Sequence, residues 1–263
     1  MPQYLNNLDD LGFELHKTGA HTSRTIMLEE LETLLSLFNY EPVKKEEYSI
    51  AIIDNNCLNK KTGISRKLTF RDLVVLYGLN PSILLFRALL YFWKRDVNGR
   101  PLLALLCALA RDSLLRGTVD LIEKTPVGAQ LKCEDMMKHL SKIFPARYSQ
   151  GTLRSISGNI NSTWTKTGHL QGRSKKVRAK ASPTPGSVSY ALLLGYLSGA
   201  KGELLFQTEY AKALDCDIHT AMDLAVDSSR KGWIVFKQLG NVIEVLFPEL
   251  IKEETRGLVN EQN

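Results

Sequence analysis

The segment 149-SQGTLRSISGNINSTWTKTGHLQG-172 carries the clearest structural pattern in the middle of the chain. With Ser149 as the N-cap, four apolar residues recur at i, i+3, i+7 and i+11 and share one helical face: Leu153, Ile156, Ile160 and Trp164. The glycine in 167-TGHL-170 ends the helix. The sequence therefore predicts an amphipathic helix over residues 149–166 that packs on a core through its apolar face.

The segments on both sides of this helix complete a larger unit. Upstream, 133-CEDMMKHLSKIF-144 carries acidic residues in its first turn and is followed by Pro145, which predicts a helix and then a turn. Downstream, 173-RSKKVRAKASPTP-185 places five basic residues within eight positions and then two prolines. Helix, turn, helix, glycine-containing stop and basic extension is the order of a winged helix-turn-helix, which we predict within a domain over residues 101–181.

Acidic residues are missing from the whole segment between Asp135 and Glu203. The gap is 67 residues long, and at the chain's average of 28 acidic residues in 263 about seven acidic residues would be expected in it. The same segment holds eleven lysines and arginines. Carboxylates repel a polyanion, and each Lys or Arg releases one of its condensed counterions. The gap therefore favours phosphate binding.

The polar face of the predicted helix adds side chains suited to nucleic acid. Opposite the apolar face we expect Arg154, Ser155, Ser157, Gly158, Asn161, Ser162, Thr165 and Lys166. Arg, Asn, Ser and Thr hydrogen-bond base edges or phosphates, and Gly158 would permit close approach of the backbone. The predicted DNA contacts are Arg147, Ser149, Gln150, Thr152, Arg154, Ser155, Ser157, Asn161, Ser162, Thr165, Lys166, Arg173, Lys175, Lys176, Arg178 and Lys180. RNA, an acidic protein partner and a solvated basic surface without a partner are the alternatives.

A second winged helix is predicted over residues 182–254. Helices are expected in 187–200, 205–216 and 217–232, and 233-WIVFKQLGNVIEVLF-247 contains two β-rich runs around Leu239-Gly240-Asn241. The segment 181-ASPTPGS-187 would join the two modules as a short linker.

The second predicted recognition helix has the wrong charge for DNA. It exposes His219, Asp223 and Asp227, with basic Arg230 and Lys231 only at its end. Carboxylates in a groove lined by phosphates are repelled, so we expect this module to pack or to contact protein.

The first hundred residues are expected to form a helical domain, with helices at about 22–38, 44–54, 68–78 and 81–95, and a further helix at 100–116. The apolar segments 81–95 and 102–110 are too interrupted or too short to cross a bilayer and are expected to be core helices. The predicted fold class is mainly α: an N-terminal helical domain over 1–100, two winged helix-turn-helix modules with short β-hairpins, and a tail over 255–263.

A separate basic segment, 55-NNCLNKKTGISRKLTFRD-72, precedes the third of these helices. It is a candidate for a secondary DNA contact through Lys60, Lys61, Arg66, Lys67 and Arg71. An exposed loop between helices would have the same composition, so both interpretations stand.

The sequence carries none of the common catalytic signatures. G-x-x-x-x-G-K-[ST], G-x-G-x-x-G, G-x-S-x-G and H-E-x-x-H are absent, and 195-GYLSGAKG-202 has the wrong spacing for a phosphate loop. The cysteines, which lie far apart with no histidine at metal-ligand spacing, indicate reduced core thiols: Cys57, Cys107, Cys133 and Cys216. The N-terminus MPQYLNNLDD lacks a signal-peptide pattern. We therefore expect a cytoplasmic protein without a cofactor or metal that is not an enzyme, although a nuclease built from dispersed carboxylates stays an alternative.

Four segments together resemble a known family. In order, "NNCLNKKTGISRKLTFRDL", "RPLLALLCALARDSLLRG", "YSQGTLRSISGNINSTWTKTGHLQG" and "NVIEVLFPEL" resemble BrxA, the small helical, winged-helix subunit of BREX phage-defence systems. The resemblance covers roughly residues 20–250 and consists of element order and degenerate patterns. It implies a non-catalytic, double-stranded DNA-binding accessory protein of the bacterial cytoplasm, acting beside a methyltransferase, an ATPase and a phosphatase-like protein. That family has also been likened to an RNA-binding antitermination factor, which keeps RNA open as a ligand.

Overall fold

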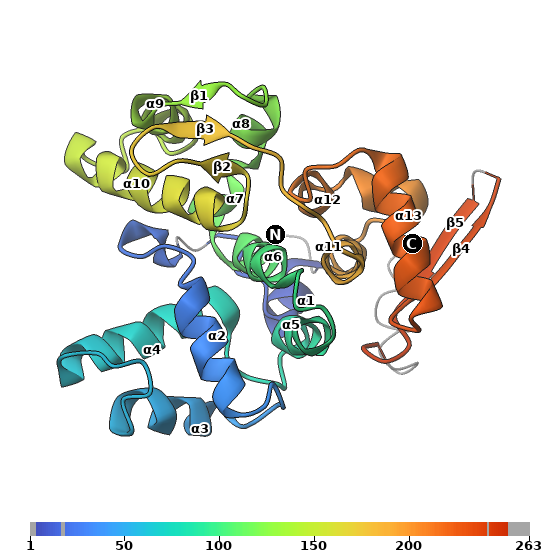
Figure 1. The fold of residues 1–263 in the computed structure, drawn as a ribbon, viewed down its shortest axis with the longest axis horizontal. Coiled ribbons are helices and arrows are strands. Elements are labelled where there is room, and N and C mark those ends of the chain that lie inside the picture. The colour runs from blue at the N-terminus through green and yellow to red at the C-terminus, as the bar shows by residue number, and fades with distance from the viewer. Residues whose placement is uncertain (1–3, 17–18, 241, 252–263) are drawn as a thin grey trace.

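The computed structural model describes residues 4–16, 19–240 and 242–251, and Figure 1 shows that the chain is mainly helical, with two small antiparallel sheets. The N-terminal elements are α1 (Tyr4–Leu11), η1 (Ala20–Thr22), α2 (Leu28–Leu37), α3 (Lys45–Ser49), η2 (Ile50–Asp54), α4 (Gly63–Tyr77), α5 (Leu84–Arg95), α6 (Arg100–Arg111) and α7 (Ser113–Arg116). The predicted tail over 255–263 lies outside the described residues.

The centre of the molecule is formed by α5 and α6. Every residue of α6 from Leu102 to Arg111 is buried, and the helix packs against α4, α5 and α11. The prediction that the two most apolar segments are core helices is thus confirmed. No helix in the part of the chain that the structure describes is long and apolar enough to span a membrane.

Several N-terminal boundaries differ from the sequence prediction for local reasons. The helix expected at 22–38 begins only at Leu28, because Met27 takes a left-handed conformation with φ 51°. The helix expected at 68–78 begins at Gly63, where the Thr62 hydroxyl accepts a hydrogen bond from the Ser65 N–H at 3.1 Å and caps it. The helix expected at 100–116 is interrupted at Asp112, whose carboxylate accepts from the Leu114 N–H at 3.0 Å and starts α7.

The middle module comprises α8 (Val119–Lys124), β1 (Gln130–Leu131), α9 (Cys133–Ile143), α10 (Gln150–Lys166), β2 (Leu170–Gln171) and β3 (Lys176–Arg178). Its three strands are antiparallel in the order β1-β3-β2. The predicted cap of α10 is confirmed, since the Ser149 Oγ accepts from the Thr152 N–H at 3.2 Å. All four residues of its predicted apolar face are buried. Strand β1 was not predicted, because two residues are too short to carry a pattern.

The C-terminal module comprises α11 (Pro185–Leu197), η3 (Gly202–Gln207), α12 (Glu209–Lys212), α13 (Ile218–Arg230), β4 (Val235–Leu239) and β5 (Val242–Leu246). The predicted hairpin is confirmed by the antiparallel pairing of β4 with β5; Asn241 in its turn lies outside the described residues. Figure 1 shows this hairpin at the far edge of the molecule, beyond α13.

Helix α11 belongs to the central core as much as to its own module. It packs on α5 and α6 as well as on α12 and α13. The Tyr190 hydroxyl donates to the Leu85 carbonyl at 3.0 Å, and the Gly186 N–H donates to the Asp96 carboxylate at 2.8 Å. The buried apolar side chains consequently form one cluster that runs from Phe13 to Ile251. All four cysteines are free thiols, but only Cys107 is fully buried and the other three are half-buried.

Candidate functional site

The polar face of α10 is narrower than the sequence predicted. Gln150, Thr152, Arg154, Ser155 and Gly158 are exposed, and Ser162, Thr165 and Lys166 are half-buried. Ser157 and Asn161, however, are buried, with 0% and 4% of their surfaces exposed. The expectation that these two side chains face solvent is wrong, because each follows a residue of the apolar face, Ile156 or Ile160, and lies at the edge of that buried face.

Arg178 is not part of an exposed basic surface either. Its side chain is buried and donates hydrogen bonds to the carbonyls of Ile122 and His169 and to both carboxylate oxygens of Asp215, at 2.8 and 2.6 Å. Burial works to raise the pKa of Asp215, but the hydrogen bonds from Arg178 and from the Ala181 N–H outweigh it and hold that pKa below its usual value. The prediction that Arg178 contacts DNA is therefore wrong: its guanidinium ties β3 to the C-terminal module.

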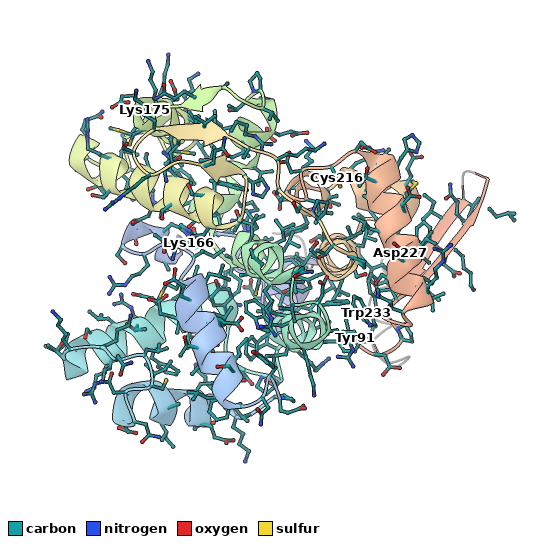
Figure 2. The ribbon with its side chains drawn as sticks, in the orientation of Figure 1. Tyr91, Lys166, Lys175, Cys216, Asp227 and Trp233 are labelled. Atoms are coloured by element: carbon teal, nitrogen blue, oxygen red, sulfur yellow. The ribbon has the colours of Figure 1, made fainter. Side chains whose placement is uncertain are left out.

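The other predicted basic contacts remain at the surface. Arg147, Arg173, Lys175 and Lys180 are exposed, as is Ser149 at the start of α10. The Arg147 guanidinium lies over the rings of Phe144 and Tyr148, at 5.8 and 5.6 Å from their centroids. Figure 2 shows Lys175 at the outer edge of the middle module. Lys176 is half-buried: its Nζ donates to the Gly172 carbonyl at 2.8 Å, and burial lowers its pKa.

Two basic residues of the acid-free segment pair with acidic residues from outside it. Lys166 Nζ lies 3.2 Å from the carboxylate of Glu29 on α2, and Arg154 Nη2 lies 3.9 Å from Glu134 at the start of α9. Both acids are mostly exposed, at 83% and 65%, so these pairs contribute little stability and compete only weakly with a phosphate. Among the described residues, no ion pair is found for Arg173 or Lys175.

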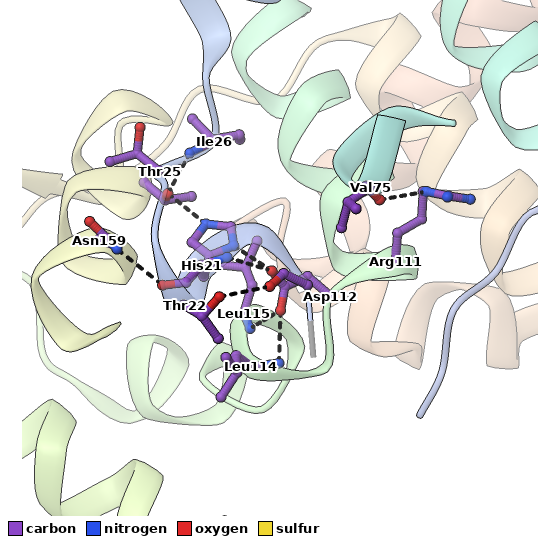
Figure 3. Close-up of polar contacts among 12 residues, drawn as sticks. His21, Thr22, Thr25, Ile26, Val75, Arg111, Asp112, Leu114, Leu115 and Asn159 are labelled. Atoms are coloured by element: carbon purple, nitrogen blue, oxygen red, sulfur yellow. Dashed lines mark hydrogen bonds and ion pairs between the residues drawn. The ribbon is translucent and has the colours of Figure 1, made fainter. Parts of the chain in front are cut away.

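A buried polar cluster fixes α10 to the N-terminal part of the chain (Figure 3). His21 Nδ1 lies 2.7 Å from Asp112 Oδ2, and His21 Nε2 lies 2.8 Å from the hydroxyl oxygen of Thr163 on α10. The same hydroxyl accepts the Ile26 N–H at 3.0 Å, and Asn159 Nδ2 donates to the His21 carbonyl at 3.1 Å. His21, Asp112 and Thr163 are fully buried. Although the cluster has the residue types of a hydrolase triad, no substrate can reach it, so its role is to position α10.

The second predicted basic segment divides between a loop and the first half of α4. Lys61 and Lys67 are exposed, whereas Lys60 pairs with Glu30 at 3.1 Å and Arg66 donates to the Ile53 carbonyl at 3.1 Å. Arg71 pairs with buried Asp72 at 2.8 Å.

Segment 20–27 brings α4 and α10 to the same region. η1 packs against both helices, and Arg24 on the following turn pairs with Asp72 at 3.1 Å. The basic segment 55–72, which runs into α4, and the basic segment that contains α10 lie far apart in the sequence but both reach segment 20–27. The sequence gives no signal for Arg24, because a lone arginine in a loop carries no pattern.

The polar surface of α13 matches the sequence prediction. His219 and Asp223 are exposed, and Asp227 is half-buried and pairs with Arg230 at 3.1 Å. Lys231 Nζ lies 5.4 Å from the ring centroid of Trp233. The two aspartates therefore keep α13 acidic except at its last turn.

No model of a known protein family matches this chain, and a search of curated proteins finds no match. Among the described residues, no group of three or more His, Cys, Asp or Glu side chains is placed to hold a metal ion.

Proposed function

We propose that the chain is a non-catalytic accessory protein that binds double-stranded DNA through its middle module. The observation that carries this proposal is the arrangement of that module. The element order β1-α9-α10-β2-β3 with the sheet order β1-β3-β2 supports the interpretation of this module as a winged helix, in which α10 would be the recognition helix and the β2–β3 hairpin the wing. Both candidate DNA-contacting elements carry exposed polar or basic side chains.

The exposed part of α10 suits close contact with a duplex. Gly151, Ser155 and Gly158 lie along it, and an added Cβ at Gly158 would meet no atom within 4 Å. Small side chains let the helix backbone approach the sugar-phosphate chain, while Arg154 and the basic turn at 173–176 supply charge. The proposed contacts are Arg147, Ser149, Gln150, Thr152, Arg154, Ser155, Ser162, Thr165, Lys166, Arg173, Lys175, Lys176 and Lys180.

The exposed lysines of α4 and its preceding loop extend this surface. Lys61 and Lys67 have no ion pair among the described residues, and α4 packs against the same segment 20–27 as α10. We propose them as secondary phosphate contacts in place of Lys60, Arg66 and Arg71, whose charged groups already have protein partners.

The resemblance to the BrxA family supplies the proposed biological setting. In that setting the protein acts in the bacterial cytoplasm within a phage-defence system, beside a methyltransferase, an ATPase and a phosphatase-like protein. The C-terminal module would provide the protein contact. Its hairpin carries apolar Leu239 and Val242 at 85% and 71% exposure, paired across the turn, which favours a protein partner over phosphate for this element.

A fluorescence anisotropy titration with unrelated duplexes at several salt concentrations tests the proposal. If about five basic side chains meet phosphates, log K should fall against log salt with a slope of roughly −4 to −5. Parallel titrations with an RNA duplex and with an acidic protein separate the alternative partners. Absence of duplex binding at low salt, or tighter binding of RNA than of DNA, would overturn the proposal.

A further inference from the structure

A buried carboxylate on α4 holds two arginines where α4 meets segment 20–27. The side chain of Asp72 is only 4% exposed. Its Oδ1 accepts hydrogen bonds from Arg71, from Nη2 at 2.8 Å and from Nε at 3.0 Å. Its Oδ2 accepts from Arg24 Nε at 3.1 Å. Two guanidinium groups around one carboxylate leave these three side chains with one net positive charge.

The two arginines are engaged by this carboxylate to different extents. Arg71 donates twice to Asp72, whereas Arg24 donates through Nε alone. Among the described residues, no acceptor is found for Nη1 or Nη2 of Arg24, and the side chain is 39% exposed. A guanidinium whose two Nη groups are free presents a planar pair of donors that matches two oxygens of a phosphate. Arg24 therefore has both a fixed orientation and free donors.

Arg24 follows directly on the segment that contacts the polar face of α10. The carbonyl of His21 accepts a hydrogen bond from Asn159 Nδ2 on α10 at 3.1 Å (Figure 3). Asn159 lies four residues after exposed Ser155, a proposed DNA contact, and so shares its helical face. The two residues between His21 and Arg24 are exposed. A duplex that contacts Ser155 is therefore next to segment 22–24.

We propose that Arg24 binds a DNA phosphate between the contacts of α10 and those of the exposed lysines of α4, and that Asp72 positions its guanidinium; the inference rests on the proposed function. The phosphate accepts from Nη1 and Nη2 of Arg24 while Nε stays on Asp72, so binding breaks no contact within the protein. A backbone contact of this kind fixes the position of the duplex and carries no sequence preference. Segment 20–27, which packs on both helices, thereby joins two basic surfaces into one.

Anisotropy titrations of the full chain with two unrelated duplexes test the contact. Arg24→Ala should weaken both duplexes equally, by about tenfold, and flatten the salt slope by about one unit, because one phosphate contact is lost. Arg24→Lys keeps the charge without the planar fork, so it should keep the slope and recover only part of the affinity. Arg95→Ala is the matched control, since this exposed arginine lies over the Tyr91 ring at the end of α5, an element without a proposed contact.

A double-mutant cycle tests the positioning role of Asp72. A carboxylate that merely repels phosphate predicts tighter DNA binding by Asp72→Asn. If Asp72 orients Arg24, Asp72→Asn should instead weaken binding several-fold in the natural protein and have no further effect in Arg24→Ala. Tighter binding by Asp72→Asn, or additive effects of the two substitutions, overturns the positioning role. The Arg24 variants decide the phosphate contact even if Asp72→Asn does not fold.

The same titrations separate this inference from the proposed function. Absence of duplex binding by the natural protein at low salt overturns the DNA proposal and the Arg24 contact with it. Duplex binding that Arg173→Ala weakens and Arg24→Ala leaves unchanged overturns the Arg24 contact alone. Equal losses in Arg24→Ala and Arg95→Ala overturn it as well, because the effect would then follow net charge and not a specific contact.

Discussion

Individual basic residues in the run 173–180 have different roles, although they look alike in the sequence. Arg178 is buried against Asp215, whereas Arg173 is exposed. Removing one partner of a buried ion pair leaves an uncompensated charge, so Arg178→Ala should lower the free energy of unfolding by about 3 kcal/mol in urea titrations. Arg173→Ala should change it by less than about 0.5 kcal/mol and flatten the salt slope of DNA binding by about one unit. A stable Arg178→Ala variant that only loses DNA affinity would contradict this assignment.

The buried side chain of His169 makes the stability of the protein depend on pH. Its ring packs edge-on against Trp164, its Nε2 lies 3.0 Å from the Ala213 carbonyl, and burial lowers its pKa to about 4 despite the nearby charge of Asp215. An unfolded histidine has a pKa of about 6.5, so between pH 6.5 and 4 the unfolded chain binds a proton that the folded chain does not. This residue should therefore reduce stability by about 3 kcal/mol as the pH falls across that window.

His169→Gln isolates this contribution, because a glutamine amide can still donate to the Ala213 carbonyl. Urea unfolding from pH 4 to 7 should show a shallower loss of stability in His169→Gln than in the natural protein. His219→Gln, at an exposed position, should retain the full pH slope. Identical slopes in the natural protein and in His169→Gln would refute the buried neutral state of His169.

Gly158 lies on the exposed face of α10, where glycine lowers the stability of the helix but leaves open space beside the backbone. Gly158 lies in the helix interior, and a Cβ added there would meet no atom. Gly158→Ala should therefore raise the free energy of unfolding by roughly 0.5–1 kcal/mol, since glycine is a poor helix former. If the helix backbone approaches DNA here, the same methyl group should lower duplex affinity. A variant that is more stable and binds DNA equally well would mean that this part of α10 does not approach the duplex.

Some features of α10 could be predicted from the sequence, and others could not. Its cap at Ser149 and its apolar face were predictable, because both depend on spacing within one element. The burial of Asn161 was not, because it depends on the segments that pack beside the edge of the apolar face, among them the β1–α9 connection. The burial of Arg178 was not either, since its partner Asp215 lies 37 residues further along the chain. Positions at the edge of an apolar face are decided by tertiary neighbours, which local periodicity does not encode.

At the scale of the whole molecule, the modules share one core instead of meeting across a linker. The predicted boundary at residues 181–182 falls just before α11, which packs on α5 and α6. Every residue of α11 from Gly186 to Gly195 is buried, and Asp96 accepts the Gly186 N–H at its first turn. Separation of the C-terminal module would therefore uncover the centre of the N-terminal helices.

A chain that ends at Pro185 should for this reason fail to fold as a cooperative unit. Loss of α11 exposes the apolar surfaces of α5 and α6 to water, which costs about 25 cal/mol for each Å² uncovered. We expect a broad, non-cooperative urea transition by circular dichroism for fragment 1–185, and restored cooperativity when fragment 186–263 is co-expressed with it. A sharp transition of fragment 1–185 alone, with native stability, would show that the modules are independent.

Because a fragment that does not fold cannot report on binding, charge variants of the full chain have to test which module carries the proposed DNA site. Asp223 and Asp227 lie one turn apart on α13 and repel phosphate, although Arg230 pairs with Asp227 at 3.1 Å. Asp223→Asn combined with Asp227→Asn should leave duplex affinity unchanged or raise it modestly. Arg173→Ala combined with Lys175→Ala should lower duplex affinity and flatten the salt slope by up to about two units, because each residue is proposed to meet a phosphate. If the aspartate variant instead changes affinity many-fold while the basic variant has no effect, the DNA site belongs to the C-terminal module and α10 is not the recognition helix.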